Sequence, residues 1–249
     1  MKVHCFSYRY AVQILQHQDY KAAWDEIEGA FEQAPLFVWP GKSSKVKRLD
    51  VVQQLMNTYF DRVLAVDLGW NYHPLATKIE GSNLKADFRK RFGDLTVQVE
   101  VQFGNMARWY TDLFKFQAGY SAKEIQLGVS VIPMYVLATR IDQNVANFER
   151  AARELPSAEL SITLPIVMFG VAPDEHTVVV DASTSSFAHP KDLTGRGNEL
   201  NRWRIIHGHL SGTPMPSISS SSATGPLPKL ADANRGIDED EEPNPKWCG

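Results

Sequence analysis

Nine consecutive residues, 95–103, alternate between apolar and polar side chains without a break. The apolar positions are Leu95, Val97, Val99, Val101 and Phe103, and the polar positions are Thr96, Gln98, Glu100 and Gln102. A period of two combined with β-branched residues predicts a β-strand with one buried face. The chain must therefore build a sheet around this strand, with Glu100 and Gln102 on the same side of it.

A further acidic residue, Asp87, lies just upstream in the shorter apolar-polar run 84–88. Residues 92–94 between the two runs have the chemistry of a tight turn, so the runs are predicted to pair as a hairpin. That pairing would bring Asp87 beside Glu100. Two carboxylates on one polar face suit a divalent cation, because Mg²⁺ typically takes one or two carboxylates together with a substrate phosphate.

Composition places the chain among ordinary globular proteins. Its 249 residues are 43% hydrophobic and 22% charged, which is enough apolar material for one domain with its own core. No run approaches the roughly 20 apolar residues of a membrane helix, and the N-terminus lacks the apolar segment of a signal peptide. Cys5 and Cys248 form neither a metal-ligand spacing nor a disulfide framework. We therefore expect a cytoplasmic protein with no membrane partner.

Charge separates a neutral body from an acidic tail. Residues 212–249 hold six acids and three bases, a net charge of −3 that equals that of the whole chain. Residues 1–211 are therefore neutral and are predicted to form a single domain, which would need a local basic patch to bind nucleic acid. The Ser- and Pro-rich tail is predicted to be disordered, because it offers too little apolar surface to offset the entropy of ordering.

The rest of the chain predicts helices interspersed with strands. Apolar residues at helical spacing run along 47–65, and aromatic residues mark a helix over 106–120 that serves the core or a dimer interface. Strands are expected over 125–133 and 164–171, the second of them apolar on both faces as in a central position. Shorter elements are expected as follows: a helix over 19–31, a helix ending near 155, an edge strand at 177–180 and a strand or helix at 201–206. This order predicts an α/β fold in which a central mixed β-sheet is flanked by helices.

The three polar residues Asp87, Glu100 and Gln102 are a weak pattern when taken alone, because most alternating strands simply expose their polar face to solvent. Two features favour a phosphate-handling site. All three side chains are predicted to converge on one face, and basic residues surround Asp87, namely Lys85, Arg89, Lys90 and Arg91.

Other polar features have simpler interpretations. The basic run 42–48 is interpreted as a solvated loop. The alternative is that it contacts phosphate at the entry to the next helix. His207 and His209 could share a metal, but a surface position is favoured because no cysteine or third histidine lies near them. The sequence contains no nucleophile triad signature, P-loop or G-x-G-x-x-G motif.

Four segments in order carry a resemblance: Ala-Asp-Phe at 86–88, Val-Glu-Val-Gln-Phe-Gly at 99–104, Asp-Leu-Phe at 112–114 and Gly-Val-Ser-Val-Ile-Pro-Met at 128–134. Together they resemble the type II restriction endonucleases of the BglII/BstYI kind. The run 165–173 fits the same pattern. The likeness extends from near the N-terminus to about residue 182 and does not cover the tail.

The resemblance implies a restriction-endonuclease-like fold of the PD-(D/E)XK superfamily and Mg²⁺-dependent cleavage of double-stranded DNA that leaves 5′-phosphates. It also implies a homodimer on a palindrome, centred on GATC in the relatives. By motif match, Asp87 and Glu100 would bind the metal. Gln102 stands where the wider superfamily usually has a lysine. Because an amide cannot carry a proton away, Gln102 would orient the attacking water, whose pKa the metal lowers.

One departure concerns the spacing of the two carboxylates. Asp87 and Glu100 are thirteen residues apart, a longer gap than in the enzymes resembled. Asp94 therefore remains an alternative to Asp87 as the first carboxylate. Asp87 is preferred because of its Ala-Asp-Phe context and its place in a strand, whereas Asp94 follows Gly93 in a predicted turn.

For base recognition, the polar loop 139–144 occupies the place of a major-groove loop in the resembled enzymes. Its candidate DNA-binding residues are Arg140, Asp142, Gln143 and Asn144. Asn105, just past the strand, is a further candidate, since Asn and Gln pair with adenine and Arg pairs with guanine. The alternative for the loop is an ordinary helix N-cap, made by Asp142 or Asn144.

These observations predict a type II site-specific deoxyribonuclease that needs Mg²⁺ and acts as a homodimer on double-stranded DNA. Helix 106–120 or helix 47–65 would supply the contacts of a two-fold dimer, which would match a palindromic site. Two other functions remain open: a structure-specific or repair nuclease of the same superfamily, and a non-catalytic DNA-binding protein that keeps the fold. The presence of all three polar residues, Asp87, Glu100 and Gln102, favours the enzyme.

Overall fold

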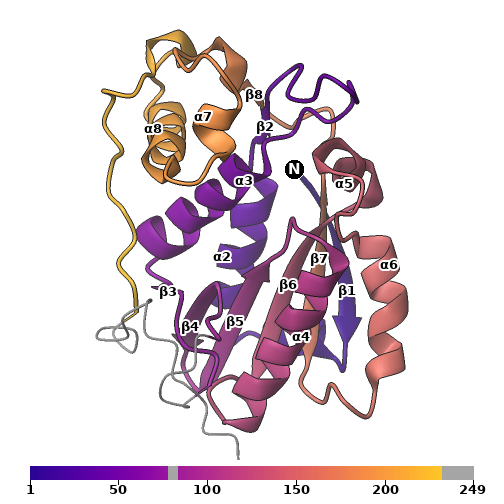
Figure 1. Ribbon diagram of the computed structural model, residues 1–249. Coiled ribbons are helices and arrows are strands. Elements are labelled where there is room, and N and C mark those ends of the chain that lie inside the picture. The colour runs from indigo at the N-terminus through magenta and orange to yellow at the C-terminus, as the bar shows by residue number, and fades with distance from the viewer. Residues whose placement is uncertain (78–83, 232–249) are drawn as a thin grey trace, which may run out of the picture.

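The computed structural model describes residues 1–77 and 84–231. Its centre is a six-stranded mixed sheet in the order β1-β7-β6-β5-β4-β3 (Figure 1). The strands are β1 (Lys2–Tyr8), β3 (Asn71–Tyr72), β4 (Phe88–Phe92), β5 (Leu95–Val101), β6 (Leu127–Pro133) and β7 (Ile166–Ala172). A separate parallel pair joins β2 (Leu36–Val38) to β8 (Val179–Asp181). The predicted α/β class with a central mixed sheet is confirmed.

Strand directions follow from the connections between the strands. β4 and β5 are antiparallel across a tight turn, with Phe88 opposite Val99 and Phe92 opposite Leu95. β5, β6 and β7 run parallel, which requires long crossovers that carry helices. β1 closes the sheet antiparallel to β7. The predicted hairpin is confirmed in its turn and its second strand, but its first strand is 88–92 and not 84–88, so Asp87 precedes this strand and does not lie in it. β7 is an interior strand whose residues are all buried.

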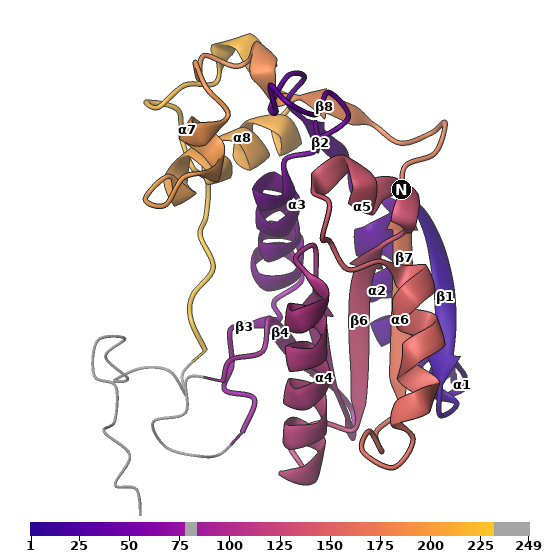
Figure 2. The same ribbon diagram turned by 45° about the vertical axis from the view of Figure 1, so that its right-hand side comes forward.

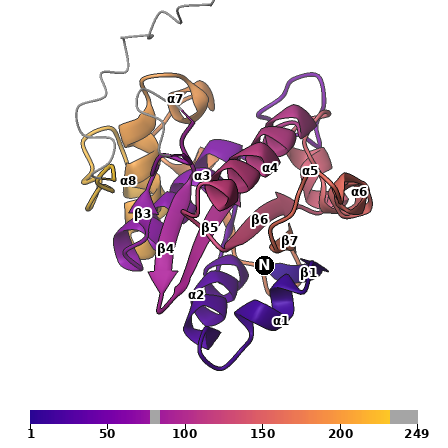
Figure 3. The same cartoon turned by 90° about the horizontal axis from the view of Figure 1, so that it is seen from below.

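Helices cover both faces of the sheet (Figures 2 and 3). α1 (Ala11–Leu15) and α2 (Lys21–Glu32) lie on one face, and α4 (Met106–Ser121) and α6 (Phe148–Glu154) lie on the other. Beyond the sheet, α3 (Gln53–Phe60) packs against α7 (Lys191–Thr194) and α8 (Glu199–Leu210). α5 (Tyr135–Ile141) packs against β6 and β7.

Two apolar clusters form the core, one on each face of the sheet. The larger cluster contains Val97 and Val99 of β5 together with residues of α2 and α3. The smaller cluster contains Trp109 and Phe116 of α4, packed with residues of β6, β7 and α6. The aromatic helix thus serves the core along one side, whereas Phe114 on its other side is 63% exposed.

The polar face of β5 is not exposed to solvent. Gln98 and Glu100 are fully buried and Gln102 is 8% exposed, because α4 lies over this face (Figure 3). The expectation of a strand with a single buried face was therefore wrong. Periodicity distinguishes the two faces of a strand, but it does not show whether a helix covers the polar one.

Two predicted element boundaries were also wrong. The helix expected over 47–65 begins at Gln53 and continues beyond Phe60 as a π-helical segment, Asp61–Asp67. The loop expected over 139–144 begins only after α5, because apolar residues of this short helix are buried against the sheet.

The tail expected to be disordered from residue 212 is partly ordered. A 3₁₀ turn, Met215–Ser217, follows α8, and Ile218 is 1% exposed within the larger core cluster. The chain then runs on to residue 231, where Ala231 N–H donates to the Tyr72 carbonyl at 3.0 Å. The prediction of disorder is wrong for 212–231, and residues 232–249 lie outside the described residues.

Within the described part of the chain, no helix has both the length and the apolar character needed to cross a membrane.

Candidate active site

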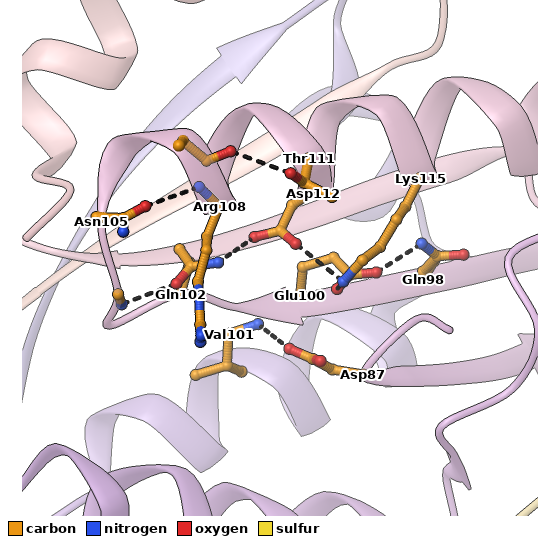
Figure 4. Close-up of polar contacts among 12 residues, drawn as sticks. Asp87, Gln98, Glu100, Val101, Gln102, Asn105, Arg108, Thr111, Asp112 and Lys115 are labelled. Carbon is orange, nitrogen blue, oxygen red and sulfur yellow. Dashed lines mark hydrogen bonds and ion pairs between the residues drawn. The ribbon is translucent and has the colours of Figure 1, made fainter. Parts of the chain in front are cut away.

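The β4–β5 hairpin brings Asp87 to the carboxyl end of β5. Asp87 directly precedes β4, and its Oδ2 accepts a 2.8 Å hydrogen bond from the N–H of Val101 (Figure 4). The strand register pairs Phe88 with Val99, so that Asp87 comes next to Glu100. The predicted approach of the two carboxylates is confirmed. The long gap between them in sequence is absorbed by the paired length of the hairpin.

Asp94, the alternative first carboxylate, lies at the opposite end of the hairpin. It is exposed in the turn, where Tyr20 donates a 2.6 Å hydrogen bond to Oδ1. Five strand pairs separate it from the Asp87 end, a distance of roughly 15 Å at the usual rise of a strand. Asp94 and Glu100 cannot share a metal ion in this arrangement, so that alternative is wrong.

Both oxygens of Glu100 have partners within the protein. Gln98 donates its amide to Oε1 at 2.8 Å, and the Lys115 ammonium lies 2.8 Å from Oε2. Gln98 is held in turn by Arg89, whose guanidinium contacts its Oε1 at 3.1 Å. The carboxylate is therefore fixed in one orientation under α4 before any ligand binds.

Gln102, just past the end of β5, is held in a similar way by α4 and by the backbone that follows it. Its amide group donates to Oδ2 of Asp112 at 2.6 Å, and its Oε1 accepts from Gly104 N–H at 2.8 Å. The other oxygen of Asp112 lies 3.0 Å from Lys115. One continuous network therefore joins Gln98, Glu100 and Gln102 through α4 (Figure 4).

Asp112 and Lys115 were not among the predicted site residues. They lie three residues apart on α4, so they share one helix face. Asp112 stands in the Asp-Leu-Phe segment of the resemblance, which was the one available signal. The sequence offers no signal for Lys115, because its position over Glu100 depends on how α4 crosses the sheet.

Burial and mutual repulsion shape the ionisation of the acids. Burial raises the pKa of Glu100 well above its ordinary value and the Asp87 charge raises it further, whereas Lys115 opposes the rise. Burial also raises the pKa of Asp87, and raises that of Asp112 to about 6. Burial alone would lower the pKa of Lys115, but the three carboxylates hold it above its ordinary value. One ammonium thus stabilises three crowded carboxylates.

A cleft of about 480 Å³ opens beside this cluster. Its other wall is polar and comes from α3, the π-helical segment, β3 and α8, which contribute Asn57, Asp61, Tyr72 and Arg202. Burial and the Asp87 charge raise the pKa of Asp61 to about 8, while Arg202 and Tyr72 oppose the rise. Sequence reasoning identified none of these four residues, because their elements meet the hairpin only in the tertiary fold.

The basic residues around Asp87 in the sequence do not face this cleft. Arg89 reaches the Leu75 carbonyl at 2.9 Å, and Lys90 forms an ion pair with Glu26 at 2.8 Å. Arg91 donates to the Gly93 carbonyl at 2.7 Å. The cations that line the cleft are Arg108, Lys115 and Arg202. The prediction that the basic run 89–91 contacts a phosphate here was wrong, since its members bind to the protein itself.

The donors present suit a hard cation such as Mg²⁺. Asp87 supplies a carboxylate to one wall of the cleft, and Glu100 lies next to Asp87 but is fully buried and does not line the cleft. Two carboxylates suffice for such a cation when waters and a phosphate complete the shell. The Oδ1 atom of Asn57 is buried at the other wall without a hydrogen-bond partner among the described residues. Within residues 1–77 and 84–231, no group of three or more His, Cys, Asp or Glu side chains is arranged to hold a metal.

Predicted base-reading residues from two elements lie side by side. Asn105 forms an isolated bridge with Val145, and Ala146 N–H donates to the Gly104 carbonyl at 2.8 Å. Asn105 is exposed beside the turn at 142–144, whose residues Asp142, Gln143 and Asn144 are exposed as well. The N-cap of α6 is Asn147, so the alternative of Asp142 or Asn144 as the cap is wrong.

Arg140 differs from these candidates because it already has a partner. It lies in the last turn of α5, and its guanidinium bonds both carboxylate oxygens of Asp50 at 2.9 and 2.7 Å. This pair holds α5 against the loop that contains the basic run 42–48. Three members of that run, Lys45, Lys47 and Arg48, are exposed.

His207 and His209 lie on α8, and neither side chain is fully exposed. The ring of His209 packs edge-on against Phe37 with 5.7 Å between centroids, and burial lowers its pKa. The favoured surface position is therefore only partly correct, because both histidines are partly buried.

Comparison with known proteins identifies one family and two similar solved structures. The profile of a family described as Restriction endonuclease BglII/BglIII matches residues 3–171. A crystal structure of restriction endonuclease BglII complexed with a DNA 16-mer is similar with a TM-score of 0.58 and 24% identity, over 71% of this chain and 79% of that chain. Free BglII gives a TM-score of 0.49 and 22% identity, over 71% and 82% of the two chains. No curated protein sequence matches significantly. The expected restriction-endonuclease-like fold is confirmed.

Proposed function

Because the chain belongs to the BglII/BglIII restriction endonuclease family, we propose that it is a type II site-specific deoxyribonuclease that cuts double-stranded DNA with Mg²⁺. The observation that carries this proposal is the approach of Asp87, which lines a polar cleft, to the buried carboxylate of Glu100. Two carboxylates held this close suit a shared divalent cation, because the single ammonium of Lys115 also has to serve Asp112.

Asp87 and Glu100 would hold the metal through their carboxylate oxygens, with the amide oxygen of Asn57 as a further oxygen in the same cleft. A bound Mg²⁺ would lower the pKa of a coordinated water molecule and offset the negative charge that builds on the scissile phosphate. Glu100 is kept rigid for this role by Gln98, and Asp87 is kept rigid by the N–H of Val101.

Gln102 orients the attacking water in this proposal. An amide neither gains nor loses a proton near neutral pH, so it cannot act as a general base. Its bonds to Asp112 and to Gly104 N–H fix the side chain at the edge of the cleft. Water then attacks the phosphorus and the bond to the 3′ oxygen breaks, which leaves a 5′-phosphate and a 3′-hydroxyl.

The paired surface of Asn105 and turn 142–144 would read the bases. Asn105, Gln143 and Asn144 carry amides that match adenine, and Asp142 can accept from cytosine. Arg140 would reach a guanine only if Asp50 released it. Lys45, Lys47 and Arg48 lie in the loop that Arg140 secures to α5, where exposed cations suit backbone phosphates.

A homodimer would place one such cleft on each strand of the DNA duplex. The outer side of α4 exposes Tyr110 at 45% and Phe114 at 63%, and aromatic residues are enriched in interfaces. The two-fold axis of the dimer would match a palindromic recognition site. We propose that this site is centred on GATC. Such an enzyme would act in the cytoplasm, the compartment that cysteine usage predicts.

Digestion of a supercoiled plasmid across a Mg²⁺ titration, with the cut ends sequenced, tests this function. We expect one fixed set of fragments, a shared palindrome at every end and 5′-phosphates. Cleavage at flaps, mismatches or other structures would instead indicate a repair nuclease. DNA binding without cleavage at any Mg²⁺ concentration would indicate a non-catalytic binding protein.

A further inference from the structure

The ammonium group of Lys115 binds the carboxylate of Glu100, which is a ligand of the proposed metal site. It lies 2.8 Å from Oε2 of Glu100, a side chain that is fully buried, while Lys115 itself is 15% exposed. Gln98 donates to the other oxygen of Glu100 at 2.8 Å. Both oxygens of this carboxylate are therefore occupied by groups of the protein.

The two partners of Glu100 differ in how they tolerate a metal ion. Gln98 is neutral and can keep its hydrogen bond while the carboxylate also binds a cation. Lys115 is positively charged, and two cations on one buried carboxylate repel each other strongly, because little water is present to screen them. Binding of a divalent ion to Glu100 and retention of the Lys115 ion pair are therefore in competition.

Asp112 gives the lysine a second place to bind. Its Oδ1 already lies 3.0 Å from the Lys115 ammonium, and its Oδ2 accepts from Gln102 at 2.6 Å. Since Asp112 and Lys115 belong to the same helix face, a small rotation about the lysine side chain would exchange Glu100 for Asp112 without moving α4.

From this geometry we propose that Lys115 is the resident counter-ion of the metal site. It holds Glu100 in place before the metal arrives, and the divalent cation displaces it onto Asp112. This inference rests on the proposed function, because it requires Glu100 to be a metal ligand. It assigns Lys115 a positioning role, which is distinct from contact with DNA.

The competition between Lys115 and a divalent ion for Glu100 can be tested by titrating the DNA-free, full-length protein with Mn²⁺. Electron paramagnetic resonance measures the concentration of free Mn²⁺ at each point. Mn²⁺ takes the same oxygen donors as Mg²⁺. At a pH high enough to keep Glu100 ionised in both proteins, the variant Lys115→Met should bind Mn²⁺ at least about tenfold more tightly than the wild type, because the competing charge is gone. The matched control is Lys21→Met, which removes an exposed lysine paired to Asp25 at 2.7 Å and should leave the affinity within about twofold. Unchanged or weaker binding by Lys115→Met would overturn the proposal.

A third variant separates this inference from the proposed function. Glu100→Gln should weaken Mn²⁺ binding. If it does not, the proposed metal site itself is wrong. If it does, and Lys115→Met binds with wild-type affinity, then only the counter-ion role of Lys115 fails.

A measurement on the wild type keeps the proposal testable if Lys115→Met does not fold. Acetylation of lysines, quantified by mass spectrometry, should be slow at Lys115 without metal and faster at saturating Mn²⁺. Lys123, exposed just beyond the end of α4, should react equally in both states. A Lys115 rate that Mn²⁺ leaves unchanged would contradict displacement.

Discussion

The backbone N–H of Val101 donates a 2.8 Å hydrogen bond to Oδ2 of Asp87, across the open end of the β4–β5 hairpin. Val101 ends one strand and Asp87 precedes the other. The bond therefore fixes the carboxylate where the sheet meets the cleft. The strand register also explains how Asp87 and Glu100 meet although they are thirteen residues apart, since the residues between them pair along the two strands of the hairpin.

Gly104→Ala should impair catalysis without unfolding the protein. A Cβ at this position would lie 2.6 Å from Oε1 of Gln102 and 3.1 Å from the Arg108 side chain. Both neighbours are flexible side chains that can move, so we expect a normal melting temperature. Gln102 would lose its bond from Gly104 N–H, and cleavage should fall by at least about tenfold. Gly29→Ala, whose Cβ would meet only ordinary contacts, is the matched control in plasmid digestion. Wild-type cleavage by Gly104→Ala would rule out a role for the fixed Gln102 amide.

Asp61 should make the stability of the protein depend on pH. Burial and the Asp87 charge raise its pKa from 3.8 to about 8, against Arg202 and Tyr72. A carboxyl group whose pKa is raised on folding stabilises the fold fully at low pH, and this contribution is lost as the pH rises through the folded value. Asp61→Asn, which stays neutral, should gain about 1–3 kcal/mol relative to the wild type between about pH 5 and pH 9.

Urea unfolding of both proteins in EDTA, at several pH values, measures this difference in the free energy of unfolding. A difference that stays constant across the range would show that Asp61 titrates as an ordinary carboxylate.

Asn105 has two roles in this account, and they can be separated. Its Oδ1 caps α4 by accepting from Arg108 N–H at 3.1 Å, and its amide is proposed to read a base. Asn105→Ser keeps a cap and should keep stability, yet lose sequence-specific binding. Asn147→Ala removes the equivalent cap of α6 and should cost about 1 kcal/mol while specific binding persists. Filter binding and thermal melting measure the two properties. Specific binding by Asn105→Ser at the wild-type level would exclude base recognition by Asn105.

The exposed aromatic side of α4 should form the dimer interface. Phe114→Ser removes the most exposed aromatic residue of this helix and should shift the protein from dimer to monomer. Analytical ultracentrifugation without DNA reports the change. Val178→Ser, at an equally apolar site that is 60% exposed, should leave the dimer intact. A dimer that persists in Phe114→Ser, or a monomeric wild type, would place the interface elsewhere or remove it.

Local patterns predicted the parts of the fold that depend on neighbours in sequence. Strict alternation over 95–103 located β5, and the turn chemistry at 92–94 located the hairpin, which together placed Asp87 beside Glu100. The buried run 164–171 identified an interior strand because both of its faces are apolar. These features succeed because a strand and its turn carry their signals in consecutive residues.

The parts that were missed depend on contacts between distant elements. Nothing local to Lys115 indicates that it lies over Glu100, since that position is set by the crossing of α4 over the sheet. Asp61 and Arg202 reach the cleft because α3 and α8 pack together. Ile218 looked like part of a polar tail, but it is buried in the larger core cluster, and Met215 packs against the same cluster.

Plasmid cleavage by Glu100→Gln tests the central claim most directly. The substitution keeps the shape of the side chain but removes the charge that a divalent cation requires. Glu175→Ala, in an exposed loop, serves as the control and should cut as the wild type does. We predict that Glu100→Gln loses cleavage by at least about a thousandfold at every Mg²⁺ concentration, while it still binds the recognition site in Ca²⁺. Mg²⁺-dependent cutting at the same sites by Glu100→Gln would contradict the account.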